Sequence, residues 1–413
     1  MNTRPRLLVI SHVLPFPGSS GQQQRVANSL RALRGRFHLT FLTYATAMQT
    51  TDWQTQLAPF CDEALLLPSL TADNYWHKSK ARVYAALNGL KPSNYLIGQV
   101  EFSPARLSEW LKGKHFDLAL YEYFHAAPSV PMLRARGIPC VLDMHDILWQ
   151  TYKRELSPQG ELSEANAKKL ARYREQEESA WLAFDGLIAI NQDELRYVES
   201  KARAEQKRFH AAMGVNLSDW PYGWQPVNPP RLAYYGGLGN HHNQAGALAC
   251  VKEIMPRVWQ RFPDAELWMI GSHPPAHLTE LAAQDQRLHV TGFVADVANT
   301  LKHVTALLCP WEGTFGFRSR LIEAMAVGVP VIATPDAVYG MDMTNEQGLW
   351  LGETTEELAT HALRFLQDPA FAAQQSRAAR QQVEKQFSFA TTYERLANEL
   401  AEWLSNFKHE RDA

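Results

Sequence analysis

Short apolar runs bounded by glycine, proline or aspartate recur along most of the chain. They are apolar throughout and do not alternate with polar positions, which is typical of parallel strands that are buried on both faces. The pattern predicts strands at Leu7–Val13, His38–Tyr44, Asp117–Tyr123, Pro139–Asp143, Gly186–Ile190, Arg231–Tyr235, Glu266–Ile270, Leu288–Thr291, Ala306–Cys309 and Pro330–Ala333.

Helical patterns separate these strands, most clearly at Gln22–Arg34, Ala245–Phe262 and Ser319–Ala326. Strands that alternate with helices predict an α/β protein with doubly wound sheets. After Thr354 the chain turns helical to its end. The stretch Tyr393–Phe407 repeats apolar residues at helical spacing. We expect this stripe to pack into the core and not to serve a partner.

One segment interrupts the series, because residues 220–230 hold four prolines and a glycine and can continue neither a strand nor a helix. We therefore predict two domains that share an architecture but no internal repeat. The expected boundaries are 1–220 for the N-terminal domain, 221–230 for a linker that acts as a hinge, 231–388 for the C-terminal domain and 389–413 for a helix that returns toward the N-terminal domain.

Composition narrows the class of protein. The 413 residues are 46% hydrophobic and 20% charged, which suits large packed cores. With 41 basic and 43 acidic residues the net charge is −2, so bulk attraction to nucleic acid is not expected, although a local basic patch stays open. The four cysteines form no Cys-x-x-Cys pair, and no apolar run reaches about 18 residues. We expect a cytoplasmic, globular protein, and the basic N-terminus leads into a first strand and not a signal peptide.

The first candidate site is the turn after the first strand, Pro15–Arg25, which carries Gly18 and Gly21 before a helix. Backbone N–H groups at such a helix start favour anions. The segment is neither a Gly-x-Gly-x-x-Gly fingerprint nor a P-loop. An ordinary loop is the alternative.

The second candidate site is the end of the strand within Gly137–Asp146, which presents His145 and Asp146. Ligands of open α/β sheets bind outside the carboxyl ends of strands. A structural His-Asp pair or a helix-capping aspartate are the alternatives. A metal site lacks further ligands at helical spacing, so we predict none.

The third candidate site lies within Pro310–Thr334, which reads as strand, glycine-containing loop, helix and strand. Arg318 and Arg320 fall at the start of the helix, where two guanidiniums suit a diphosphate. Glu323 comes one turn later and could accept the two hydroxyls of a ribose. The alternative is an exposed Arg/Glu face with a solvent ion pair.

This third segment resembles the nucleotide-binding signature of glycosyltransferase family 4, whose members have the GT-B fold. The family carries a Glu, seven residues and a Glu, followed by Ala-Met-Ala-x-Gly-x-Pro-Val. Further pieces resemble successive family elements in order, and together they cover nearly the whole chain: Leu7–Leu30, Phe116–His125, Pro139–Asp146, Asp185–Ile190, Met213–Asn216, Tyr234–Leu238, Glu266–Gly271, Val290–Val297 and Ala306–Ala333.

The resemblance implies two Rossmann-like domains that face each other across a cleft, and a retaining transferase that needs no catalytic metal or other cofactor. The C-terminal domain would bind the nucleotide-sugar donor and the N-terminal domain a saccharide or lipid-linked saccharide acceptor. The donor residues would be Gly21, Gly236, Gly237, Gly316, Phe317, Arg318, Arg320 and Glu323. His145 and Asp146 would be catalytic, and Glu122, Tyr123 and His125 are weaker candidates for acceptor contacts.

The chain also departs from the family pattern. Phe315 stands where the first motif glutamate belongs, and Glu312 would need a three-residue shift. The segment Gly236–Asn243 lacks the Arg and Lys usual after the first strand of the C-terminal domain. We hypothesise that Arg318 and Arg320 replace them. Two other functions stay open, namely a nucleotide-sugar epimerase of the same fold and an inactive nucleotide-sugar-binding module, whereas a nicotinamide dehydrogenase lacks its glycine fingerprint.

A basic and aromatic stretch, 75–91, is the candidate for the acceptor side. It holds four Lys or Arg residues, no acidic residue and interleaved aromatics. Such a helix suits an anionic membrane surface. The alternative is a solvated helix whose aromatics pack inward. On the membrane hypothesis the protein is peripheral at the inner face and the acceptor is a lipid-linked saccharide.

Overall fold

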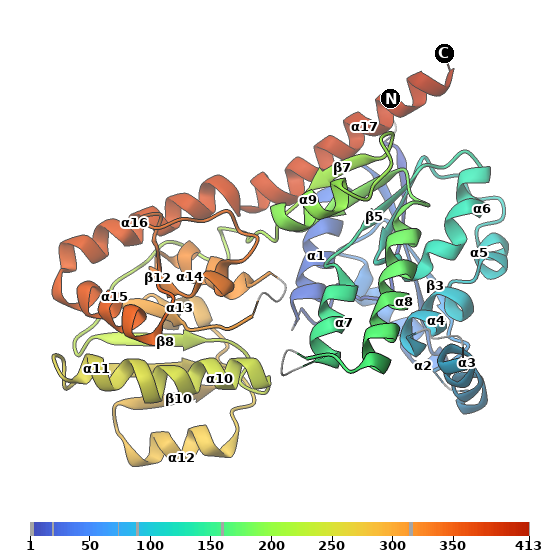
Figure 1. Ribbon diagram of the computed structural model, residues 1–413. Helices are drawn as coiled ribbons and strands as arrows, with labels where there is room; N and C mark the ends of the chain where they lie inside the picture. Colours follow the sequence, from blue (N-terminus) through green and yellow to red (C-terminus); the bar gives the residue numbers. More distant parts are fainter. Residues whose placement is uncertain are drawn as a thin grey trace. The chain divides into compact units, whose positions relative to one another are not determined.

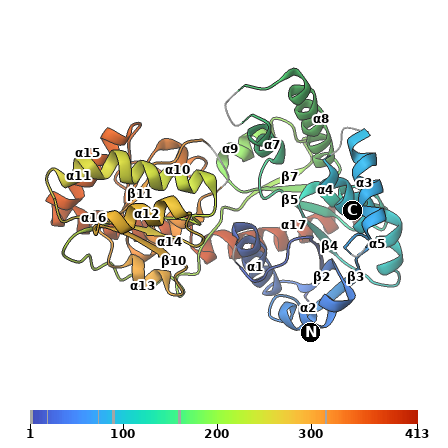
Figure 2. The same ribbon diagram turned by 90° about the horizontal axis from the view of Figure 1, so that it is seen from below.

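Figure 1 shows the computed structural model, which describes residues 4–18, 20–72, 74–87, 91–157, 161–313 and 317–412. The chain forms two compact units. Unit 1 comprises residues 1–211 and 393–413, and unit 2 comprises residues 212–392. Each unit is built around one parallel sheet with helices packed on both of its faces (Figures 1 and 2).

Unit 1 contains a seven-stranded sheet with the order β3-β2-β1-β4-β5-β6-β7. Its strands are β1 (Arg6–Ile10), β2 (His38–Ala45), β3 (Glu63–Pro68), β4 (Leu118–Glu122), β5 (Cys140–Asp143), β6 (Gly186–Ala189) and β7 (Lys207–His210). Its α-helices are α1 (Gly21–Arg34), α2 (Ala47–Leu57), α3 (Tyr75–Leu87), α4 (Pro92–Tyr95), α5 (Pro104–Trp110), α6 (Val130–Ala135), α7 (Leu148–Leu156), α8 (Glu164–Trp181), α9 (Gln192–Glu199) and α17 (Arg395–Asp412). A π-helix, η1 (Leu96–Glu101), and a 3-10 helix, η2 (Phe124–Ser129), complete it.

Unit 2 contains a six-stranded sheet with the order β10-β9-β8-β11-β12-β13. Its strands are β8 (Arg231–Tyr235), β9 (Glu266–Ile270), β10 (Leu288–Gly292), β11 (Ala306–Cys309), β12 (Val331–Ala333) and β13 (Leu349–Leu351). Its helices are α10 (His241–Ala249), η3 (Cys250–Ile254), α11 (Met255–Trp259), α12 (Ala276–Gln284), α13 (Val297–Leu301), α14 (Ser319–Val327), η4 (Pro335–Val338), α15 (Thr355–Gln367) and α16 (Pro369–Gln386), and η5 (Ala390–Glu394) spans the boundary with unit 1.

The predicted α/β class is confirmed, and each of the ten predicted strands is present. Three strands were missed: β3, β7 and β13. All three lie at the edge of a sheet. An edge strand has one neighbour and needs no long apolar run, unlike a central strand. Strand β7 is half-polar and β13 spans only three residues, so neither of these two gives such a run.

Burial explains why the central strands are apolar throughout. In unit 2, Ala233, Leu307 and Val331 belong to a core on one side of the sheet together with residues of α14. Their immediate neighbours Leu232 and Leu308 belong to a second core with residues of α11 and α15. Because side chains alternate between the faces of a strand, both faces of this sheet are dry.

The proline-rich segment does not behave as the predicted linker. The chain leaves unit 1 between residues 211 and 212, before this segment begins. Within unit 2, Gly223 N donates to Val327 O at 3.0 Å, Gln225 N donates to Lys302 O at 2.7 Å, and Trp224 Nε1 donates to Val304 O at 2.9 Å. These bonds fix residues 221–230 to unit 2, so this segment is no free hinge.

The C-terminal helix α17 lies in unit 1 and packs against α1. Its stripe of Leu396, Leu400 and Leu404 is buried, and Trp403 makes an edge contact with Phe209 of β7 at 5.9 Å. The expectation that this stripe is core is confirmed. Among the described residues, no helix, α17 included, is long and apolar enough to cross a bilayer.

Gly348 provides a test of the packing in unit 2. Its φ is +76°, and an added Cβ would lie 2.2 Å from the Cα of Ala379 in α16. Gly348→Ala should therefore lower the free energy of unfolding by about 2–4 kcal/mol, since it combines overpacking with a left-handed alanine. Gly292→Ala is the matched control, because its φ is +66° but nothing lies within 4 Å of the new methyl group. Denaturant midpoints of the two variants should differ clearly, and equal midpoints would contradict this packing.

Candidate active site

The carboxyl ends of neighbouring strands bring the predicted unit 1 residues together. Strand β4 pairs in parallel with both β1 and β5, so the three strands end at the same edge of the sheet. Glu122 ends β4, and Tyr123 and His125 come directly after it. His145 comes two positions after the end of β5. These four predicted residues thus belong to one cluster.

The backbone is strained at two residues of this cluster. Tyr123 has φ +68° and His145 has φ +59°, conformations that side chains larger than glycine adopt rarely. Their rings stack at a centroid distance of 4.3 Å with an interplanar angle of 19°. Each such residue costs on the order of 1–3 kcal/mol, and such strain is concentrated at functional sites.

Two further rings join this stack. His125 lies parallel to Tyr123 at 5.6 Å, and His12 contacts Tyr123 at 5.4 Å and His125 at 5.1 Å. Burial, together with the charge of His145, lowers the pKa of His12 to about 4. Burial also lowers the pKa of His125, so both imidazoles are neutral near pH 7. His12 is not among the predicted site residues, although it lies just after the first strand and therefore at the same edge of the sheet.

An ion pair lies beneath this cluster. Arg25 of α1 and Asp143 at the end of β5 are both buried. The guanidinium donates from Nε and Nη2 to the carboxylate at 2.8–3.1 Å, and from Nη1 to Ala211 O at 2.9 Å. The carboxylate counteracts the burial of Arg25 and raises its pKa.

The ligand atoms of Glu122, Asp143 and His145 lie within 4.8 Å of one another, as those of a metal site would. The Arg25 guanidinium, however, already supplies the positive charge that Asp143 needs, and it engages both carboxylate oxygens. A divalent cation here would have to displace or approach that guanidinium. The absence of a metal ion at these three residues stays a prediction.

Asp146 is half-buried and accepts a bond from Thr151 Oγ1 at 2.5 Å. A second acid, Glu194 of α9, is buried close to it. Burial and then the Asp146 carboxylate raise the pKa of Glu194 well above its usual value. Glu194 is not among the predicted site residues, because a glutamate near the start of a helix gives no sign of a distant acidic neighbour.

Gly21 is the first residue of α1 and is exposed. The preceding Ser20 caps the helix, and its side chain accepts a bond from Gln23 N at 3.3 Å. The predicted anion-binding role of Gly21 stays a prediction.

In unit 2, the end of β8 comes close to the end of β9. A Cβ on Gly271 would lie 1.8 Å from Gly236 O, so only glycine fits there. Gly237 has open space around it, and its carbonyl accepts a bond from Asn243 Nδ2 of α10 at 2.8 Å. The two predicted glycines therefore form a tight, accessible turn at the carboxyl edge of this sheet.

Glu323 of α14 is buried at this same edge, with 2% of its surface exposed. Its carboxylate accepts bonds from Tyr235 Oη at 2.7 Å and from Arg320 Nη1 at 2.7 and 3.0 Å. Burial, reinforced by the Glu323 charge, raises the pKa of Tyr235. The exposed Arg/Glu face that was the alternative does not occur, because the carboxylate is enclosed.

Arg318 does not have the surroundings expected of a diphosphate ligand. Its Nη1 donates to Asp336 O at 3.0 Å and to Ala337 O at 3.4 Å, and its Nη2 donates to Gly313 O at 2.9 Å. Its guanidinium also stacks over the Trp311 ring at 4.3 Å. Through these contacts Arg318 joins the loop before α14 to the segment after β12.

The loop before α14 carries the remaining predicted donor residues. Gly316, and Phe315 in place of the first motif glutamate, lie outside the described residues. Phe317 packs against Phe387 at 5.8 Å and against the core around α14. Its donor contact stays a prediction.

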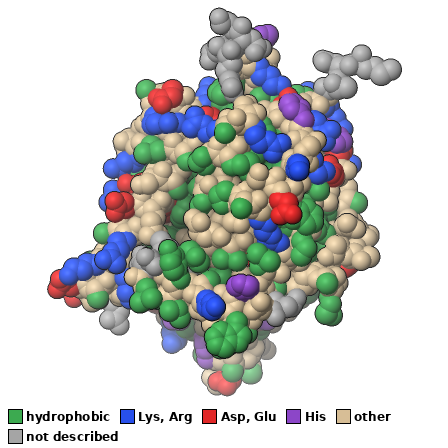
Figure 3. Space-filling model, turned by 90° about the vertical axis from the view of Figure 1, so that its right-hand side faces the viewer, with side chains coloured by type: hydrophobic (Ala, Val, Ile, Leu, Met, Phe, Trp, Pro, Cys, Tyr) green, Lys and Arg blue, Asp and Glu red, His purple; other side chains and the backbone are tan. Residues whose placement is uncertain are grey.

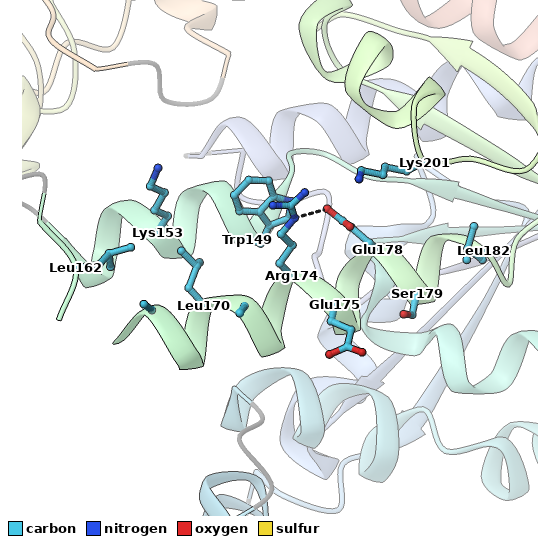
Figure 4. Close-up of a pocket in the computed structure, with 12 residues that line it drawn as sticks. Trp149, Lys153, Leu162, Leu170, Arg174, Glu175, Glu178, Ser179, Leu182 and Lys201 are labelled. Atoms are coloured by element: carbon cyan, nitrogen blue, oxygen red, sulfur yellow. Dashed lines mark hydrogen bonds and ion pairs between the residues drawn. The ribbon is translucent and has the colours of Figure 1, made fainter. Parts of the chain in front are cut away.

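A separate groove of about 690 Å³ runs between α7 and α8 in unit 1 (Figure 4). Its walls include Trp149 and Leu170, and Lys153 and Lys201 also line it. Arg174 pairs with Glu178 there at 2.7 Å. None of the predicted site residues that the structure describes lines this groove.

Comparison with known proteins finds a family match within unit 2. Residues 229–368 match the profile of the family described as glycosyl transferases group 1. A phosphatidyl-myo-inositol mannosyltransferase of Mycobacterium leprae is 25% identical over 252 residues, which are 59% of this chain and 62% of that protein. The match thus spans less than two thirds of that relative.

Solved structures extend the comparison to the whole fold. Sucrose-phosphate synthase from Thermosynechococcus elongatus superposes with a TM-score of 0.69 at 17% identity, over 98% of this chain and 100% of that one. Anabaena HepE in complex with UDP superposes with a TM-score of 0.64 at 15% identity, over 96% of this chain and 100% of that one. The two parallel sheets, each in a Rossmann-like unit, are those of the GT-B fold, and residues 229–368 carry the match to the group 1 glycosyl transferases.

Proposed function

We propose that this chain is a glycosyltransferase that moves a sugar from a nucleotide-sugar donor to a saccharide or lipid-linked saccharide acceptor, with retention of configuration and without a metal ion. The observation that carries the proposal is the burial and hydrogen bonding of Glu323. A buried carboxylate, held by Tyr235 and Arg320 at the carboxyl edge of a doubly wound sheet, suits the hydroxyls of a ribose. Anabaena HepE, solved with UDP, supports a uridine nucleotide as the first candidate.

Arg320 is the better candidate for the donor diphosphate. About a third of its side chain (35%) is exposed, and it sits in the first turn of α14. A cation at a helix N-terminus is well placed to hold a phosphate group, because the orphan N–H groups and the guanidinium act together. Arg318, by contrast, directs its two Nη atoms to backbone carbonyls.

The proposed reaction breaks the bond between the anomeric carbon and the donor phosphate oxygen. A new bond forms from an acceptor hydroxyl oxygen to the same face of that carbon, and the hydroxyl proton passes to the leaving phosphate. Fixed positive groups stabilise the charge that the diphosphate gains. An epimerase would instead form product from the donor alone, and an inactive module would bind the donor without turnover, so an acceptor-free assay and a binding assay separate the three functions.

Helix α3 supports a membrane-bound acceptor. The alternative, that its aromatics pack inward, is wrong, because its buried residues are Ala81 and Ala85. Tyr75 is 81% exposed, Trp76 75% and Leu87 80%. Figure 3 shows the side of the molecule that lies on the right in Figure 1, and in its lower part hydrophobic side chains lie beside basic ones.

The exposed basic residues of this surface are Lys80 and Arg82, with Lys78 half-buried. Lys91 is engaged elsewhere, since it pairs with Glu155 at 3.1 Å and lies over the Tyr152 ring at 4.7 Å. We propose that α3 docks on an anionic bilayer at the cytoplasmic face, where it would meet a lipid-linked acceptor. The lipid substrate in the name of the mycobacterial relative supports this choice.

The donor proposal predicts a contact between Glu323 and the ribose. Calorimetry should show that the protein binds UDP about 10- to 100-fold more tightly than 2′,3′-dideoxy-UDP, because hydrogen bonds to a charged group are lost. Glu323→Gln should lose most of that preference. Equal affinities for the two nucleotides in the unaltered protein would contradict the ribose contact, and a prior thermal-shift screen of UDP-, GDP- and ADP-sugars decides which base to use.

The contacts of Arg318 predict a loss of stability. Arg318→Ala should lower the free energy of unfolding by about 2–3 kcal/mol, because three carbonyl bonds and a stacked ring are lost. Arg257→Ala is the control, since it removes only exposed contacts, an ion pair with Glu356 and a bond to Glu253 O, and should cost much less than Arg318→Ala. If Arg318→Ala kept full stability but lost donor turnover, the result would instead support the predicted contact between Arg318 and the donor diphosphate.

The membrane proposal predicts two kinds of loss in vesicle co-sedimentation. Replacing Lys78, Lys80 and Arg82 together by alanine should weaken binding to phosphatidylserine-containing vesicles about a hundredfold, at roughly 1 kcal/mol per charge. Trp76→Ser should weaken binding to neutral vesicles as well. Phe293→Ser is the matched control, because this residue is 82% exposed but lies in unit 2. Unchanged binding of both α3 variants would overturn the proposal.

A further inference from the structure

A buried glutamate stands directly behind the predicted catalytic histidine. Glu122 is 2% exposed and His145 is 6% exposed. The Oε2 atom of Glu122 makes a short contact with Nε2 of His145. Because an isolated buried carboxylate is costly, a proton must lie between these two atoms.

The charges around the pair show why His145 is the partner that matters. Arg25 neutralises Asp143 through its guanidinium. Glu122 is left with His145 as its hydrogen-bond partner, since its Oε1 is buried and bonds to no group in the part of the chain that the structure describes. Burial raises the pKa of Glu122, and the His145 charge counteracts that rise. The two side chains therefore form one unit.

His145 is held in two places at once. Its backbone N donates to Asp143 Oδ1 at 3.3 Å, which helps to maintain the left-handed φ of +59°. Its ring is fixed by Glu122 at Nε2 and by the stacked ring of Tyr123 at 4.3 Å. No described residue bonds to Nδ1, so this nitrogen is left for a ligand.

We propose that Glu122 is a positioning residue, which keeps the proton on Nε2 of His145, orients the ring with Nδ1 toward the reacting groups, and stabilises the imidazolium when Nδ1 is also protonated. A carboxylate behind an imidazole has this effect because it fixes the tautomer and balances the positive charge. Glu122 itself touches no substrate in this arrangement. Its assignment as an acceptor contact is replaced by this role, since the side chain is enclosed.

The inference rests on the proposed transferase function, so its test has one part that needs no activity. Protein labelled with ¹⁵N-histidine reports the protonation of each ring nitrogen by NMR, and His145→Asn identifies the His145 signals by their loss. We expect a protonated Nε2 in the unaltered protein without substrate. An unprotonated Nε2 would overturn the proposal, whatever reaction the protein catalyses.

The kinetic part uses Glu122→Gln, which keeps the shape but removes the charge. We expect kcat to fall about 10- to 100-fold, as for other residues that orient a functional histidine, with the donor KM changed less than about threefold. Glu122→Asp should recover part of kcat, because it restores the carboxylate. Tyr121→Phe is the control, since it removes another buried bond of β4, from Tyr121 Oη to Ser129 Oγ at 2.9 Å, and should leave kcat unchanged.

The outcomes separate the two proposals. An unchanged kcat in Glu122→Gln, or a loss that appears only in KM, would overturn the positioning role. If Glu122→Gln does not fold, Glu122→Asp and the NMR spectrum of the unaltered protein still decide it. If the unaltered protein binds nucleotide sugars but transfers nothing, the transferase function fails while the NMR result stands by itself.

Discussion

The Arg25–Asp143 ion pair is the interaction on which the carboxyl edge of unit 1 depends. Removing both charges from water costs several kcal/mol per ion. The pair is stable only because the guanidinium donates hydrogen bonds to both carboxylate oxygens and to the Ala211 carbonyl. It joins α1 to the end of β5 and to the residue where the chain leaves unit 1. A lysine could not make these bonds, since it lacks the planar fork. Through Asp143 the pair also supports the strained backbone of His145.

Unit 2 uses the same chemistry at its own carboxyl edge, with one difference. Glu323 is buried and paired with Arg320, but Arg320 is partly exposed whereas Arg25 is not. An arginine with free surface can gain a second anionic partner, whereas a fully enclosed one cannot. The two units thus place one closed and one open arginine–carboxylate pair at corresponding edges. The closed pair organises a site, and the open pair is suited to bind a ligand.

Much of the fold could be predicted from the sequence because it depends on local pattern. Apolar runs marked the central strands, and the helical pattern at Ser319–Ala326 predicted α14. What the sequence concealed depends on partners far away in the chain: Arg25 and Asp143 are 118 residues apart, and the acid beside Asp146 lies on another helix. The proline-rich segment failed as a linker for a similar reason. Prolines prevent regular structure, but they do not show whether hydrogen bonds fix the segment to a neighbour.

The position of α17 in unit 1 has a consequence for the order of synthesis. A ribosome releases residues 1–211 first, then all of unit 2, and only afterwards the helix that covers α1 and β7 with Leu396, Leu400 and Leu404. The unit that is synthesised first is therefore the last to be completed. Until then its apolar groove for α17 is open to water, while unit 2 already has every strand of its sheet. Apolar surface that stays exposed in this way during synthesis favours aggregation.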